Sequence, residues 1–262
     1  LSPGDGDVLW WAMGVAVNSG LDVTVREPDV SPLQLQGPKA PLVARDLFGD
    51  WAVEMKYYRL RETELDGIPL VVSRTGWSGE LGYELYLRDG QYGDELWERV
   101  MKAGEAYGIR PAAPSTIRSI EGGLLSYVSD ITLDDNPWVI GMGRFVEFDQ
   151  PGDFIGKAAL SAVAAEGPAR RLIGIEIDGP AFEVPNEEYW TISVGGESVG
   201  RVTRCAHSPR LDRNIGWANV PVALADIGTE LSVHAPDGQR RAVVCKAPWF
   251  EPQIKIPDEM KP

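Results

Sequence analysis

The chain has 262 residues, 44% of them hydrophobic and 24% charged, and a formal net charge of −14 at pH 7. This is the composition of a folded globular protein with room for two compact domains. The acidic balance and the lack of a basic stripe argue against nucleic acid and against a membrane surface as partners. Two well-separated cysteines, Cys205 and Cys245, and no bilayer-length apolar run predict a reduced, cytoplasmic protein.

The first part of the sequence alternates between helical and strand-like patterns. Asp66-Gly67 separates two strand-like runs, and this dipeptide favours the tight turn of a β-hairpin. The elements predicted in chain order are a helix over 8–19, strands over 21–26 and 33–36, a helix over 40–48, the two hairpin strands, a strand over 83–87 and a helix over 92–108.

The middle of the sequence predicts two further helices with a strand between them. The first runs from Ser115 to Leu124, with Ser115 as N-cap, because Pro114 disfavours helical conformation before it. A strand is predicted over 142–149. The second helix has Asp153 as N-cap and ends at Gly167.

After residue 168 the pattern changes to short strands separated by turn residues. They are predicted over 171–177, 189–194, 198–205, 214–220, 230–235 and 240–250. Such spacing is typical of a small barrel or jelly roll. We therefore expect an α+β protein, with mixed α/β lobes over 1–168 and an all-β barrel or jelly-roll module over 169–262. The proline-rich tail after Phe250 is expected to lie extended on the surface.

Several common site types are not supported. His207 and His234 lie far apart, so no imidazole-based metal site is predicted. Gly76, Gly79 and Gly82 have a dinucleotide-like spacing. However, a strand follows them where that fingerprint needs a helix N-terminus to receive the pyrophosphate.

The segment RTGWSGELGYELYL, residues 74–87, remains as the candidate ligand-binding element. Its aromatic residues Trp77 and Tyr83 can stack on a flat ring, and the carboxylate of Glu84 can accept two parallel hydrogen bonds from an aminopyrimidinone edge such as that of a pterin. Two alternatives stay open. The segment is a plain glycine-rich hairpin, or Tyr83 is a core residue, because adjacent strand residues point to opposite faces.

This segment resembles the RTGYTGE-x-G-[FY]-E signature of the aminomethyltransferase (glycine cleavage T-protein) family of folate enzymes. LQLQGPKA from Leu33, DFIGKAAL from Asp153 and HSPRLDRNIGWANVP from His207 resemble further family segments in the same order. The resemblance implies folate-binding lobes within 1–168, tetrahydrofolate as cofactor, Glu84 holding the pterin ring, and Trp77 and Tyr83 beside it. The family's N-terminal part is not recognised, so an upstream segment or a second chain is expected to supply it. The catalytic acid therefore stays unassigned.

The segment PSTIRSIEGGLLSY bears on which molecule donates the transferred group. In it, Ser115 and Ser119 stand at the positions of two family arginines. This form resembles the folate-dependent demethylases of dimethylsulfoniopropionate or methoxylated aromatics. It implies transfer of a methyl group from an S- or O-methylated small molecule to N5 of tetrahydrofolate. Tyr127, Asn136 and Trp138 are the substrate-side candidates, with packing or turn roles as the alternative. The competing interpretations are aminomethyl transfer in glycine cleavage, the folate half of an amine demethylase, and a non-catalytic folate-binding protein.

Overall fold

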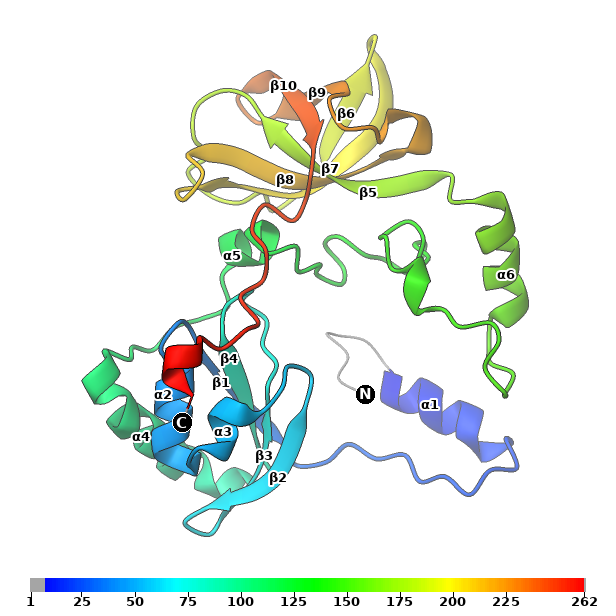
Figure 1. Ribbon diagram of the computed structural model, residues 1–262. Helices are drawn as coiled ribbons and strands as arrows, with labels where there is room; N and C mark the ends of the chain where they lie inside the picture. Colours follow the sequence, from blue (N-terminus) through cyan, green and yellow to red (C-terminus); the bar gives the residue numbers. More distant parts are fainter. Residues whose placement is uncertain (1–7, 262) are drawn as a thin grey trace. The chain divides into compact units, whose positions relative to one another are not determined.

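The computed structural model describes residues 8–261 (Figure 1). By its internal contacts the chain forms two compact units. The first holds the residues up to Pro114 together with the segment from Pro252 onwards, and the second is Ser115–Glu251. The sequence-based division after residue 168 stays a prediction.

The first unit is built on a four-stranded antiparallel sheet with strand order β1-β4-β3-β2. One face of the sheet is covered by helices α2 and α4, whose apolar side chains form a single core with those of the strands. The elements are α1 Val8–Val17, β1 Ser31–Gln36, α2 Ala40–Phe48, α3 Trp51–Glu54, β2 Leu60–Leu65, β3 Ile68–Ser73, β4 Gly82–Leu87 and α4 Gly93–Gly104, with short 3₁₀ turns at Gly90–Tyr92 and Glu105–Tyr107.

The predicted hairpin is confirmed. Asp66 and Gly67 both have positive φ, 49° and 88°, as the two central residues of a hairpin turn between β2 and β3 require. The predicted strand over 21–26 is wrong. These residues have no neighbouring strand to pair with, and Leu21 and Val23 are exposed. Within residues 8–261, none of the helices is long and apolar enough to cross a lipid bilayer.

The second unit contains a closed antiparallel barrel with strand order β10-β5-β8-β7-β6-β9, visible at the top of Figure 1. This confirms the predicted α+β class with a C-terminal barrel. The barrel interior is filled by aliphatic side chains from all six strands. The elements are α5 Thr116–Glu121, α6 Lys157–Glu166, β5 Arg170–Ile177, β6 Trp190–Val194, β7 Glu197–Ser208, β8 Arg213–Pro221, β9 Glu230–Ala235 and β10 Gly238–Cys245, with 3₁₀ turns at Gly143–Phe145 and Val222–Leu224.

The predicted start of α5 is confirmed, because the Ser115 side chain accepts a hydrogen bond from Arg118 N at 3.3 Å. Two neighbouring predictions are wrong. Residues 142–149 form a 3₁₀ turn and irregular chain, since no strand lies beside them. Helix α6 begins at Lys157 after Gly156, which has φ +87°, so Asp153 is not its N-cap. Its predicted end at Gly167 is confirmed.

The C-terminal tail after Phe250 is largely exposed and irregular, as expected, but Ile256 anchors it. Ile256 is buried in a small apolar cluster with Val53 and Leu81 of the first unit. Arg74 Nη2 donates to the carbonyl oxygen of Ile254 at 2.9 Å. The buried Ile256 side chain and the hydrogen bond from Arg74 attach the tail to the first unit at these two points. A further 3₁₀ turn, Asp258–Met260, follows.

Candidate functional site

The first unit has a pocket of about 550 Å³ on the face of the sheet opposite α2 and α4. Strand alternation creates it, because Tyr83 and Leu85 point into the core while Glu84 and Tyr86 point the other way. The wall is mainly apolar and aromatic around one carboxylate. It includes Tyr57, Tyr58, Leu60, Trp77 and Tyr86 around Glu84.

Sheet register places Glu84 at the centre of this face. Its neighbour on β3 is Ser73, and its neighbour on β1 is Gln34. Gln34 Nε2 donates to Glu84 Oε1 at 3.4 Å. On the other oxygen, Oε2 accepts hydrogen bonds from Thr75 Oγ1 and, at 3.2 Å, from the Tyr86 hydroxyl. The carboxylate is therefore held in one orientation, while Oε1, with one long hydrogen bond, keeps lone pairs for a ligand's donors.

The phenols beside Glu84 stay neutral at physiological pH. Burial, followed by the neighbouring Tyr58 phenol, raises the pKa of Tyr57 to about 12. Burial and then the charge of Glu84 also raise the pKa of Tyr86. A neutral Tyr86 hydroxyl can donate to the carboxylate, so the negative charge of the pocket is concentrated on Glu84.

The structure brings Glu84 and Trp77 together in this pocket and separates Tyr83 from them. Trp77 is 38% exposed, whereas Tyr83 is fully buried and donates its hydroxyl to Ala52 O at 2.9 Å. Tyr83 therefore lies in the core, the second of the two roles that the sequence left open. The two-residue period of a strand would have identified Tyr86 as the aromatic partner of Glu84.

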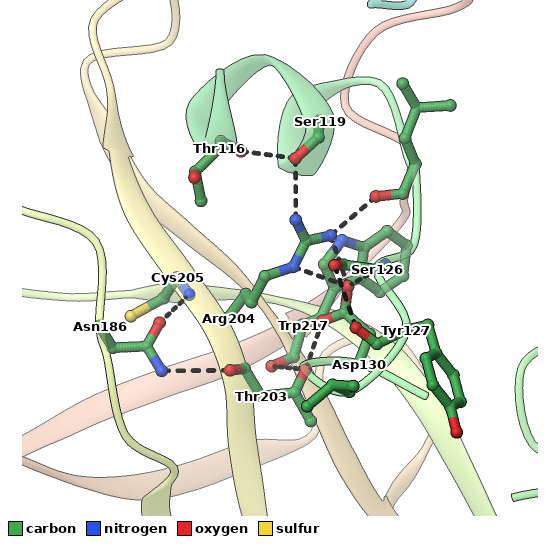
Figure 2. A network of polar contacts seen from close by, with 12 residues as sticks. Thr116, Ser119, Ser126, Tyr127, Asp130, Asn186, Thr203, Arg204, Cys205 and Trp217 are labelled. Atoms are coloured by element: carbon green, nitrogen blue, oxygen red, sulfur yellow. Dashed lines mark hydrogen bonds and ion pairs between the residues drawn. The ribbon is translucent and has the colours of Figure 1, made fainter. Parts of the chain in front are cut away.

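The second unit contains a buried ion pair between Arg204 of β7 and Asp130 of the loop after α5 (Figure 2). Arg204 Nε donates to Asp130 Oδ2 at 2.7 Å, and Nη2 contacts the same oxygen. The remaining guanidinium donors reach Ser119 Oγ at 2.8 Å and Leu124 O at 2.7 Å. Every arm of this guanidinium thus holds α5 or the chain that follows it to the barrel.

Asp130 is equally well satisfied. It is 1% exposed, and it also accepts hydrogen bonds from Thr203 Oγ1 at 2.8 Å and from Ser126 N at 2.9 Å. The loop from Ser126 to Ile131 is therefore rigidly positioned. Figure 2 shows the Tyr127 ring pointing away from this network, and Tyr127 is partly exposed.

The other two substrate-side candidates follow in the same unit. Asn136 Oδ1 accepts from Trp138 N at 3.1 Å and from Val139 N at 3.3 Å, which makes it a turn-capping residue. The Trp138 ring stacks on Phe148 with centroids 6.2 Å apart. Both side chains therefore have structural contacts, while the Tyr127 ring points outward. In the part of the chain that the structure describes, no three His, Cys, Asp or Glu side chains are grouped as metal ligands.

Two family models match the sequence over most of its length. The GCVT N-terminal domain matches residues 4–150, and the glycine cleavage T-protein C-terminal barrel domain matches residues 170–251. The chain belongs to the glycine cleavage T-protein family. The predicted family membership is thereby confirmed.

Individual T-protein relatives carry two kinds of name. A dimethylsulfoniopropionate demethylase of Ruegeria pomeroyi is 37% identical over 250 residues, covering 95% of this chain and 67% of the relative. An aminomethyltransferase of Symbiobacterium thermophilum is 36% identical over 236 residues, covering 88% of this chain and 62% of the relative. This chain therefore spans about two thirds of the length of these relatives or less.

A solved structure shows the same fold. It is the crystal structure of the glycine cleavage system aminomethyltransferase T from Bartonella henselae, with a TM-score of 0.79, 22% sequence identity, and coverage of 95% of this chain and 66% of that chain. The T-protein-like segments of the sequence now have places in this fold. The segment from Arg74 joins β3 to β4, and LQLQGPKA joins β1 to α2.

Proposed function

We propose that the protein carrying this chain is a tetrahydrofolate-dependent methyltransferase that demethylates an S- or O-methylated small molecule. The observation that supports it best is Glu84, a single oriented carboxylate within an aromatic and apolar pocket. The 37% identity to a dimethylsulfoniopropionate demethylase favours a methyl donor. Tetrahydrofolate, when bound, supplies N5 as the methyl acceptor.

The residues of the pocket fit a pterin by the chemistry of their donors and acceptors. The amino and ring N–H groups of an aminopyrimidinone edge are parallel donors, and a carboxylate is their complementary acceptor. Thr75 and Tyr86 hold the Glu84 carboxylate in place, so little orientational entropy is lost on binding. The exposed part of the Trp77 ring is available for stacking. In this proposal the chain binds and orients its reactants, and the proton-transferring acid stays unassigned.

The preference for demethylation over aminomethyl transfer rests on the two serines of α5. Ser115 caps the helix, and Ser119 is buried against Arg204. An arginine at position 119 would place a second guanidinium against that of Arg204, and this supports the demethylase interpretation of the two serines. Tyr127, Asn136 and Trp138 are retained as proposed substrate-side residues, of which Tyr127 has the most accessible ring.

A second candidate function is aminomethyl transfer, because a relative named aminomethyltransferase is 36% identical. A third, of another class, is folate binding without catalysis. The full-length protein is assayed for methyl-tetrahydrofolate formation with methylthio, methoxy and methylamino donors, and for glycine-cleavage aminomethyl transfer. Turnover with a methylthio or methoxy donor supports the proposal. Turnover of the aminomethyl donor alone would favour the second candidate over the proposal. Tetrahydrofolate binding without turnover of any donor would favour the third candidate.

The site itself is tested by Glu84→Gln in the same protein. Loss of the charge-assisted hydrogen bonding at Glu84 Oε1 is expected to weaken tetrahydrofolate binding about tenfold to a hundredfold, measured by calorimetric titration. Glu62→Gln is the matched control, since Glu62 lies on strand β2 at the edge of the same sheet and pairs with Arg88 at 3.1 Å. An unchanged dissociation constant for Glu84→Gln would refute the pterin assignment.

A further inference from the structure

The turn that precedes β2 contains a residue type that its backbone conformation disfavours. Tyr58 has φ +58°, in the left-handed region. It is the third residue of a tight turn closed by the hydrogen bond from Arg59 N to Lys56 O at 3.2 Å. Glycine or asparagine is the ordinary choice at such a position, because a side chain crowds the backbone there.

Tertiary contacts maintain this conformation. Tyr58 N donates to Arg74 O at 3.2 Å, and Arg74 N donates to Arg59 O at 2.8 Å. The turn is thereby fixed to the chain that leaves β3 and continues towards Trp77. A strained backbone held by surrounding hydrogen bonds is a feature that recurs at ligand-binding sites.

Burial does not offset the strain. The Tyr58 side chain is 73% exposed, and it therefore contributes little hydrophobic stabilisation. Its ring lies against that of Tyr57, with centroids 4.3 Å apart and an interplanar angle of 55°. It also lines the same pocket as Glu84. Within the fold the ring contacts Tyr57, and its large exposed area on the pocket wall is what a ligand in the pocket would cover.

The other non-glycine residues with positive φ among residues 8–261 differ from Tyr58. Asp66 forms the β2–β3 hairpin turn, and Asp212 is a short polar residue in a barrel turn. Val128 has both backbone groups hydrogen-bonded, its N to Ile131 O at 2.7 Å and its O to the Tyr189 hydroxyl at 2.8 Å. None of these three lines the pocket.

We propose that Tyr58 is a ligand-contacting residue whose ring packs on a flat heteroaromatic ligand held at its amino-amide edge by Glu84. The identity of that ligand as a reduced pterin rests on the proposed function. Tyrosine suits the task because it presents a large amphipathic face with few rotatable bonds, and the bound ring covers apolar surface that is otherwise exposed. The fixed turn keeps this face in position before the ligand arrives.

The test uses Tyr58→Gly, which removes the ring and the backbone strain together. Its melting temperature is expected to equal or exceed that of the wild type, while tetrahydrofolate binding weakens about fivefold to tenfold. Tyr58→Phe keeps the ring and is expected to retain wild-type affinity. Asp212→Gly, with φ +53°, provides the same backbone change away from the pocket and is expected to leave affinity unchanged.

Three patterns of results would overturn the inference, and each points to a different cause. If Glu84→Gln loses affinity but Tyr58→Gly binds as tightly as the wild type, the Tyr58 assignment is wrong and the pterin site stands. If the wild-type protein does not bind tetrahydrofolate, the proposed function fails and the Tyr58 ligand is no longer a pterin. Weakened binding by both Tyr58→Gly and Tyr58→Phe would assign the effect to the hydroxyl instead of the ring, and would also contradict the proposal.

Discussion

The buried Arg204–Asp130 pair should be the most sensitive polar contact of the second unit. Asp130→Asn removes the negative charge but keeps the side-chain shape, and it leaves the Arg204 guanidinium uncompensated in a nearly closed site. Breaking a buried pair by removing one partner costs about 3–5 kcal/mol. With a denaturant dependence of about 2 kcal/mol per M urea, the unfolding midpoint should fall by about 1.5–2.5 M.

The assay is equilibrium urea unfolding followed by tryptophan fluorescence, with hydrogen exchange to assign the transition to residues 115–251. Glu176→Gln is the matched control, because Glu176 pairs with Arg213 at 2.9 Å on the barrel surface. An exposed pair contributes about 0–1 kcal/mol, so the control midpoint should move little. The double variant Asp130→Leu with Arg204→Met removes both charges and should recover part of the lost stability.

A loss below about 1 kcal/mol for Asp130→Asn would refute this reasoning, since it would mean that water solvates Arg204 once the pair is broken. A double variant less stable than Asp130→Asn would refute it too. In that case the charged network itself would stabilise the fold more than apolar side chains do. The loss in Asp130→Asn would then not be explained by the cost of an unpaired buried charge alone.

Three further predictions concern other parts of the molecule. Tyr83→Phe should lower the free energy of unfolding by about 0.5–1.5 kcal/mol and leave folate affinity unchanged, because the Tyr83 hydroxyl forms its hydrogen bond within the core. Urea unfolding and calorimetric titration measure the two effects. Weakened folate binding would show that Tyr83 contributes to the site. The pKa of Tyr57 is raised to about 12, so the folded chain keeps a proton that the unfolded chain releases near pH 10, and stability should fall as pH rises from about 10 to about 12. Urea unfolding at a series of alkaline pH values should show that the free energy of unfolding falls less steeply with pH in Tyr57→Phe than in the wild type. The same slope in both proteins would contradict the raised pKa of Tyr57. Ser119→Arg should destabilise by about 3 kcal/mol or more, and Arg204→Ser in the same chain should restore part of that loss; additive destabilisation would show that the two positions do not compete.

Local sequence signals predicted the elements whose formation depends on local chemistry. The Asp66-Gly67 turn, the Ser115 cap and the Gly167 helix end were found because each residue type suits its own backbone conformation. The false strands over 21–26 and 142–149 had suitable composition but no partner strand. Strand formation requires a neighbour to hydrogen-bond with, and that neighbour is not encoded in the segment itself.

The same distinction applies to the candidate site. Glu84 and Trp77 were found from one contiguous segment, and strand periodicity already allowed Tyr83 a place in the core. Gln34 could not be connected with Glu84, because the two residues meet only through the register of β1 on β4. Tyr58 could not be identified either, since its strained backbone has no sequence signal and a tyrosine in a turn looks like an ordinary surface residue.

The segment from Pro252 to Lys261 has a consequence for how this protein is made. The first unit begins before the barrel in the sequence and is completed after it. During translation the ribosome must therefore release the whole barrel before Gln253 N can bond Gly79 O and Arg74 can bond Ile254 O. These contacts fix the turn that carries Trp77. A nascent chain therefore lacks these hydrogen bonds until residues 253 and 254 have been made, and the turn that carries Trp77 receives them last.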